Sequence, residues 1–217
     1  MMPDSPEQST PVNGEKADMM NDFLGSAQIF ALAMSQVIEE ELWREAADNQ
    51  LAVSQLRLLK LINLPGGHTI SEVAAFLGVS KAAASKSVDR LARRMLLRRS
   101  EGEKDRRAVF LTLTGAGIRL LEAYNLATRR KLAGVFGQFS REELEQVVSL
   151  MDRLSAQIVN HSSRPEELCM QCGIHYRETC LLRQRFDRKC IYLRQRERSG
   201  NAPENQNGST EQAPASP

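Results

Sequence analysis

Four cysteines gather in one short segment near the end of the 217-residue chain. They have the spacing Cys-x2-Cys-x7-Cys-x9-Cys and lie at Cys169, Cys172, Cys180 and Cys190. Four thiolates suffice for a tetrahedral zinc ion or for an iron–sulfur cluster. The Cys-x2-Cys pair before Gly173 is typical of a metal knuckle, because the turn lets two thiolates reach one ion. The spacing therefore predicts a zinc site, with an iron–sulfur cluster as the alternative.

The surroundings of the cysteines give reasons for and against one shared metal site. Residues 164–198 carry nine Lys or Arg against five Asp or Glu, and this positive charge would lower the pKa values of the thiols. The sequence around Cys180 and Cys190 has a helical pattern, which would separate these two thiols by about 15 Å along an unbroken helix. One site then requires a break near Phe186–Lys189. Redox-switch thiols, or cysteines without such chemistry, stay open as alternatives.

Composition and termini indicate where such a protein works. Hydrophobic residues make up 41% of the chain, and the formal net charge of +2 names no partner by itself. The polar start, "MMPDSPEQSTPVNGEK", lacks the charged and apolar regions of a secretory signal. No apolar run approaches the roughly 18 residues of a membrane span. We expect a cytoplasmic protein without membrane contact, whose thiols stay reduced rather than paired in disulfides.

Most of the remaining chain has the apolar periodicity of helices. Two stripes with three- and four-residue spacing predict a long first helix and a last helix, which begins at the capping box of Ser140 and Glu143. Residues 1–16 and 199–217 are polar and are predicted to be disordered. The structured part should comprise residues 17–161, followed by a cysteine-rich segment at 164–198. The stripes are Phe23, Ala27, Phe30, Met34 and Val37 in the first helix, and Leu144, Val147, Met151, Leu154 and Ile158 in the last.

Between these helices the sequence predicts three short helices, a β-hairpin and a further helix. The first short helix ends at "LPGG", the second begins at a capping box of Thr69 and Glu72 and ends at Gly78, and Ser80 caps the third. Alternation at residues 109–113 predicts a strand, with "EGEKD" as the charged tip of the hairpin, and Thr114 caps a helix to about residue 136. The buried side of the Ser80-capped helix should contain Ala84, Val88, Leu91 and Met95.

Short helices followed by a basic hairpin are the layout of a winged helix-turn-helix, so the fold class should be mainly α with a two-stranded wing. Residues 80–107 carry ten Lys or Arg against four Asp or Glu, which favours double-stranded DNA as partner. The Ser80-capped helix would present its first turn to a major groove about 12 Å wide. The wing would enter the minor groove through its arginines. The candidate DNA-binding residues are Ser80, Lys81, Ala82, Ala83, Ser85, Lys86, Lys104, Asp105, Arg106 and Arg107.

The stretch "SEVAAFLGVSKAAASKSVDRLARRMLLRRSEGEKDRRAVFLTLTGAG" resembles the MarR family of bacterial transcription regulators. The most specific part is Asp105-x-Arg107 followed by "VFLTLTGAG", and the resemblance extends over roughly residues 20–160. It implies a winged-helix homodimer whose first and last helices dimerise, with Arg107 in the minor groove and Asp105 bracing it. Met95 departs from the family pattern, which usually has glycine at that position.

The predicted function is that of a transcription regulator, with repression as the predicted mode, acting on a pseudo-palindromic operator. A small ligand, a metal state or an oxidant would serve as effector by changing the spacing of the two reading helices. Two other classes stay open, a protein-interaction adaptor and a thiol oxidoreductase built on Cys169 and Cys172. The second is disfavoured, because a redox motif of that kind belongs in a βαβ setting and no other catalytic constellation is present in the sequence. We therefore expect no enzyme.

Overall fold

A computed structural model describes four parts of the chain. They are residues 12–64, 68–101 and 109–162 and, in the cysteine-rich segment, residues 168, 171–175, 177, 180 and 181. The side chains are described from residue 17 onward, except those of residues 101 and 109. The predicted disorder at residues 1–11 and 199–217 lies outside this part and stays a prediction. The described residues form two compact units that divide between Val53 and Ser54.

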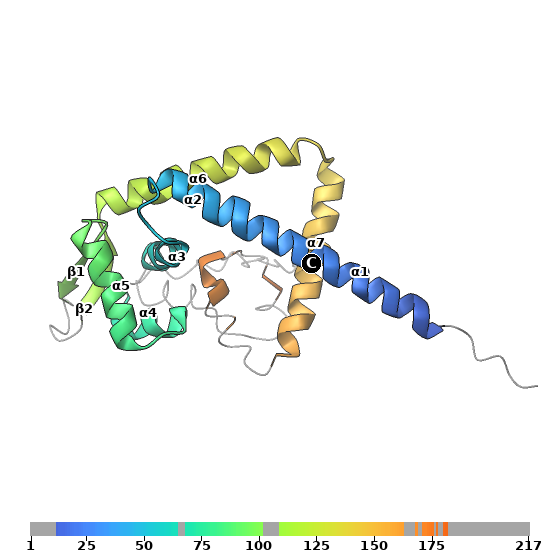
Figure 1. The fold of residues 1–217 in the computed structure, drawn as a ribbon, viewed down its shortest axis with the longest axis horizontal. Helices are drawn as coiled ribbons and strands as arrows, with labels where there is room; N and C mark the ends of the chain where they lie inside the picture. Colours follow the sequence, from blue (N-terminus) through green and yellow to red (C-terminus); the bar gives the residue numbers. More distant parts are fainter. Residues whose placement is uncertain are drawn as a thin grey trace, which may run out of the picture. The chain divides into compact units, whose positions relative to one another are not determined.

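The first unit is the long N-terminal helix that the apolar stripe predicts. It runs as α1 (Val12–Ala33), a π-helical stretch η1 (Met34–Glu41) and α2 (Leu42–Ala46), and α1 begins within the range for which disorder was predicted (Figure 1). The helix ends where Asp48 and Asn49 adopt positive φ values of 49° and 56°. Trp43 is fully buried, and its indole Nε1 donates a hydrogen bond to the carbonyl of Ala52 at 3.1 Å.

The second unit contains the helix-turn-helix. It contains α3 (Val53–Ile62) apart from its first residue, followed by α4 (Ile70–Leu77) and α5 (Lys81–Arg93). The four leucines of α3 are fully buried. The predicted capping box of α4 is present, and Gly78 ends α4 with a left-handed φ of 65°. α4 packs against α5 and α5 against the first wing strand (Figure 1). The fully buried apolar residues of this core include Leu56, Leu58, Leu59, Leu61, Val73, Ala84, Val88, Leu91 and Leu111.

The predicted wing is confirmed as an antiparallel hairpin. Its strands are β1 (Leu97–Glu101) and β2 (Val109–Leu113), paired from Leu97↔Leu113 to Glu101↔Val109. The buried His68 adds a single bridge on the other side of β2, where the Leu111 N–H donates to its carbonyl at 2.9 Å. This bridge ties the hairpin to the chain just before α4.

The turn between α5 and β1 differs from its prediction. Met95 was expected on the buried side of the helix, but α5 ends at Arg93 and Met95 is 71% exposed. Its φ is +57°, a left-handed conformation that glycine adopts without strain. The Thr114 hydroxyl donates to the Met95 carbonyl at 2.5 Å, and the Thr114 N–H donates to the Leu96 carbonyl at 3.1 Å. The turn thus has the geometry of a glycine turn although it contains methionine.

Replacing Met95 by glycine should therefore stabilise the protein. A left-handed non-glycine residue costs about 1–2 kcal/mol, and glycine loses part of that gain through its freer unfolded chain. We expect Met95→Gly to raise the free energy of unfolding by roughly 0.5–1 kcal/mol in urea denaturation. Met95→Ala removes the same exposed side chain but keeps Cβ, so it should bring no gain. Equal gains in both variants would show that side-chain exposure, and not φ, is responsible.

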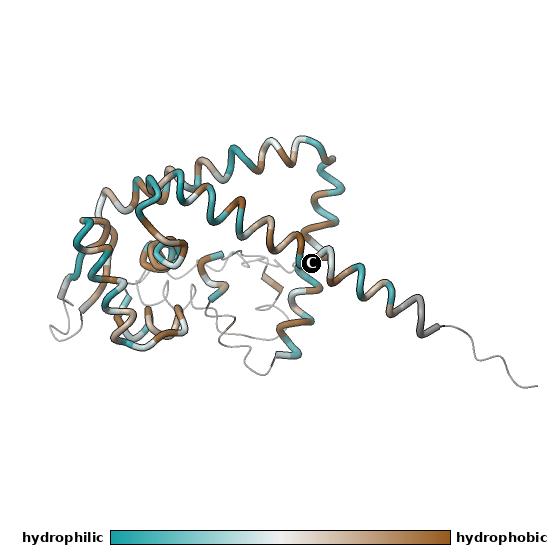
Figure 2. The backbone as a smooth tube through the Cα atoms, viewed as in Figure 1, coloured by the Kyte–Doolittle hydropathy of each residue, from teal (hydrophilic) through white to brown (hydrophobic). Residues whose placement is uncertain are grey.

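Two long helices complete the second unit, α6 (Gly115–Phe136) and α7 (Arg141–Asn160), both with the predicted N-caps. The predicted apolar residues of α7 form a stripe, hereafter the α7 stripe, that stays largely open in the single chain. Val147, Met151 and Ile158 are 52%, 41% and 61% exposed, and brown and teal stretches alternate along α7 in Figure 2. A membrane span needs a longer or more apolar helix than any that the described ranges contain.

The described residues of the cysteine-rich segment lie partly along α7. Arg177 forms an ion pair with Asp152, and Leu181 helps to line an open groove of about 510 Å³ with Leu144, Val148 and other α7 residues. A short 3-10 turn (η2, Gly173–His175) follows Cys172, with Gly173 buried. Arg177 and Leu181 therefore lie against α7.

Candidate nucleic-acid interface

The first turn of α5 is exposed at the surface. Ser80 is extended, and its hydroxyl accepts a hydrogen bond from the Ala83 N–H at 3.2 Å, as predicted for the N-cap. Lys81, Ala82 and Ala83 are exposed, while Ala84 is fully buried and fixes the inner side of the helix. Because Ala82 and Ala83 are small and the helix N-terminus carries partial positive charge, this turn can approach an anionic groove closely.

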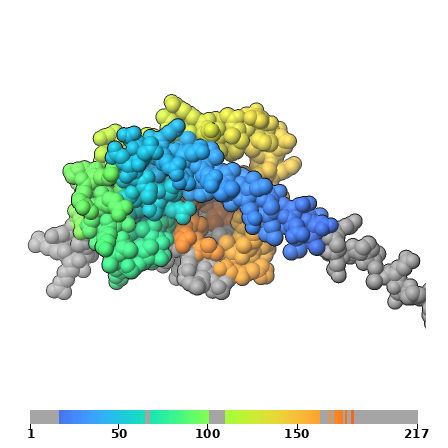
Figure 3. All heavy atoms as spheres, in the orientation of Figure 1, coloured from blue at the N-terminus to red at the C-terminus, as the bar shows by residue number. Residues whose placement is uncertain are grey.

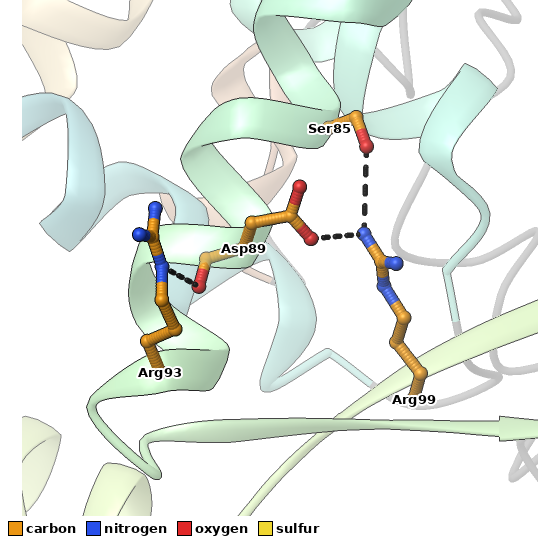
Figure 4. Close-up of polar contacts among 4 residues, drawn as sticks. All are labelled: Ser85, Asp89, Arg93 and Arg99. Carbon is orange, nitrogen blue, oxygen red and sulfur yellow. Dashed lines mark hydrogen bonds and ion pairs between the residues drawn. The ribbon is translucent and has the colours of Figure 1, made fainter.

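Ser85 and Lys86 continue the exposed face in different ways. Lys86 is exposed, whereas Ser85 is half-buried and its hydroxyl lies 3.4 Å from the Arg99 Nη2 of strand β1. Asp89, one turn further along α5, accepts from the same Nη2 at 2.6 Å (Figure 4). Ser85 is therefore engaged by the wing strand within the protein, although its hydroxyl proton can still be donated.

Further basic side chains flank this turn. From residue 80 to residue 100 the chain has seven Lys or Arg and one acidic residue, Asp89. In Figure 3 the atoms of α5 and β1, in green, form part of the outer surface. The DNA-binding residues predicted from the sequence did not include Arg94 in the turn or Arg98 and Arg99 in β1. The alternation of side chains along β1 could have shown that one of its two arginines lies on the face toward α5, because Arg98 and Arg99 point to opposite faces of the hairpin. The exposed arginines of this region are Arg90, Arg93, Arg94, Arg98 and Arg99.

The other predicted site residues lie mostly outside the described residues. Lys104, Asp105, Arg106 and Arg107 belong to the wing tip, for which only the flanking strands are described. In the sequence these four residues lie between Glu101 and Val109, the last pair of the described strands, and their role stays a prediction.

Of the four predicted metal ligands, Cys172 and Cys180 are described and both are half-buried, while Cys169 and Cys190 lie outside the described residues. Within the described ranges, no three His, Cys, Asp or Glu side chains group in a way that could hold a metal ion. The four-thiol site stays a prediction.

Comparison with known proteins identifies this arrangement. Residues 51–109, which contain α3, the helix-turn-helix and the first strand of the wing, match the model of the MarR family. This part of the chain has a winged-helix fold like that of the family whose model it matches. The HTH-type transcriptional repressor MdtR of Bacillus subtilis (strain 168) is 24% identical over 135 residues, which cover 62% of this chain and 87% of MdtR.

Solved structures share the fold. Streptococcus pneumoniae FabT in complex with DNA superposes with a TM-score of 0.55 at 23% identity, over 67% of this chain and 99% of FabT. RV1404 from Mycobacterium tuberculosis has the same TM-score and identity, over 70% of this chain and 97% of its own. At these identities the structures establish the mainly helical winged-helix fold. MdtR is a transcriptional repressor by its name, and the FabT structure is a complex with DNA.

Proposed function

We propose that this protein is a DNA-binding transcription regulator that acts as a homodimer on a pseudo-palindromic operator, with repression as its mode. The exposed first turn of α5 carries the proposal, because a capped helix end with small side chains lies among seven basic residues and one acidic residue. The MarR-type fold, the repressor MdtR and the DNA complex of FabT support the same function.

In this proposal the two parts of the winged helix have separate tasks. The first turn of α5 enters the major groove, where Lys81 and Lys86 reach phosphates or base edges and the alanines contact thymine methyl groups. The wing tip, with Arg107 braced by Asp105, enters the adjacent minor groove. An effector that changes the spacing of the two α5 helices releases DNA, because both half-sites must be contacted at once.

The homodimer is supported by apolar surface that the single chain leaves open on two helices. On α7 the exposed residues include Val147, Met151 and Ile158, and on α1 they include Phe23 and Phe30. Contiguous apolar stripes of this kind mark association surfaces. A symmetric dimer would cover them and set two α5 helices about 34 Å apart, one turn of DNA.

The function is tested by equilibrium binding to duplex DNA over a range of salt concentrations. We expect the wild-type protein to select duplexes from a random pool and to bind them less tightly as salt rises. The double variant Lys81→Ala/Lys86→Ala should lose at least about tenfold in affinity and show a shallower salt dependence. Lys131→Ala, an exposed position of α6, is the matched control and should bind as wild type does. Sequence-independent binding would contradict specific regulation, and capture of a protein partner without DNA binding would favour the adaptor.

We also propose that Cys169, Cys172, Cys180 and Cys190 bind zinc, with an iron–sulfur cluster as the alternative. Support comes from the clustering of all four cysteines within 22 positions, from the half-buried thiols of Cys172 and Cys180, and from the buried Gly173 in the turn after Cys172. Anaerobically purified protein should contain one zinc per chain and be colourless, whereas absorption near 400 nm would indicate a cluster. Cys172→Ser should lose the metal. Metal-free wild-type protein with four titratable thiols would exclude both.

A further inference from the structure

One arginine of the wing joins two residues of the reading helix. The Nη2 atom of Arg99, on β1, lies 2.6 Å from Asp89 Oδ1 and 3.4 Å from Ser85 Oγ (Figure 4). Ser85 and Asp89 are four residues apart, so they share one face of α5. The Arg93 Nε donates to the Asp89 backbone carbonyl at 3.4 Å, and this contact stays within the helix. The Ser85–Asp89–Arg99 cluster thus connects α5 directly to the wing by side chains.

The cluster is too exposed to contribute much to the stability of the fold. The side chains of Arg99 and Asp89 are 42% and 46% exposed, and ion pairs at that exposure are screened by solvent. The buried residues of α5, namely Ala84, Val88 and Leu91, already hold the helix in the core. What the cluster adds is a fixed contact between residues 10 and 14 positions apart, across the turn that contains Met95.

The negative charge of Asp89 also affects DNA binding in this proposal. It is the one acidic residue between positions 80 and 100, on the face that would meet DNA phosphates. By Coulomb repulsion alone, a carboxylate there would weaken binding to every duplex. Pairing with Arg99 compensates that charge within the protein, and a single guanidinium nitrogen, Nη2, contacts both the carboxylate of Asp89 and the hydroxyl of Ser85.

We infer that Asp89 and Arg99 are positioning residues that set the angle between α5 and the wing and thereby determine how well the protein distinguishes its operator from other sequences. This inference rests on the proposed DNA-binding function. An error in that angle misplaces the first turn of α5 in the major groove when the wing is seated in the minor groove. Contacts to base edges need closer placement than contacts to phosphates, so specific binding suffers more than non-specific binding.

The first test separates geometry from charge. Arg99→Lys keeps the positive charge, but its ammonium lies one bond short of the Nη2 position and is not held in a guanidinium plane. Arg98→Lys is the matched control, because Arg98 lies next along β1 on the other face and its Nε donates to Thr112 Oγ1 at 3.2 Å. Affinities are measured for a duplex that the wild-type protein selects from a random pool and for a shuffled duplex of the same composition. We expect Arg99→Lys to lower the ratio of the two affinities about tenfold or more, and Arg98→Lys to change it less than about twofold.

The second test compares the direction in which the affinity changes for the selected and the shuffled duplex. Asp89→Asn removes a negative charge, so repulsion alone predicts tighter binding to both duplexes. The positioning role predicts tighter binding to the shuffled duplex and weaker binding to the selected one. Glu122→Gln, at an exposed site of α6, makes the same charge change elsewhere and should leave the ratio unchanged. Thermal melting of all variants should stay within a few degrees of wild type, as expected for an exposed ion pair.

The outcomes distinguish the inference from the function on which it rests. If the wild-type protein does not prefer its selected duplex, the proposed function fails. If it does, and both Arg99→Lys and Asp89→Asn keep the wild-type ratio, the positioning role is wrong. Tighter binding of Asp89→Asn to both duplexes by the same factor would also overturn it, because Asp89 would then act by repulsion alone.

Discussion

Gly117→Ala is expected to destabilise the protein more than any other single-methyl change in α6. A Cβ atom built at Gly117 would lie 2.1 Å from the backbone carbonyl oxygen of Leu96 and 3.5 Å from Leu113 Cδ2. The Leu96 oxygen cannot swing aside, because it accepts the Thr114 N–H at 3.1 Å within the turn that carries Met95. Backbone must therefore shift, which costs about 3 kcal/mol or more of the free energy of unfolding. Urea denaturation at fixed protein concentration measures this loss.

Gly134→Ala supplies the matched control in the same helix. No atom lies within 4 Å of a Cβ built at Gly134, so alanine fits there without contact. Because glycine within a helix is less favourable than alanine, Gly134→Ala should stabilise by roughly 0.5–1 kcal/mol. The same chemical change then has opposite signs at two positions of one helix. Equal effects at both would show that the α6 start does not pack against the Leu96 carbonyl as described.

Local signals made much of the fold predictable. A cap depends on residues three positions apart, so the boxes at Thr69 and Ser140 and the caps at Ser80 and Thr114 could be identified and are confirmed. Met95 was assigned to the wrong side because its spacing continues the α5 stripe, although Met95 lies two positions beyond the end of the helix at Arg93. The π-helical stretch Met34–Glu41 follows an unbroken helical pattern, so the sequence gives no sign of it.

Only the part of the candidate site that lies within one helix could be predicted from the sequence. The exposed first turn of α5 follows from a cap and a stripe within that helix. The contact of Arg99 with Ser85 and Asp89 joins a strand to a helix 10 and 14 residues away, and its register depends on how β1 packs beside α5. Charge counting recognised this region as basic, but it could not say which arginine is engaged within the protein.

Met151→Arg is expected to abolish both dimerisation and tight DNA binding. Met151 is 41% exposed within the α7 stripe, between Val147 and Leu154 on the same face. In a dimer that covers this stripe, an arginine would bury an unpaired charge among apolar side chains. The variant should sediment as a monomer, and its affinity for the selected duplex should fall about 100-fold or more, because each monomer contacts only one half-site.

The matched control is Gln146→Arg, which adds the same side chain to α7 five residues earlier. Helical spacing places residue 146 about 140° around the helix from residue 151, outside the stripe. This variant should remain dimeric and bind DNA as wild type does. Folding is followed separately, since a dimer that melts as a unit has a melting temperature that rises with protein concentration. A wild-type protein that is monomeric at micromolar concentration, with a concentration-independent melting temperature, would contradict the homodimer, because the stripe would then stay open in solution.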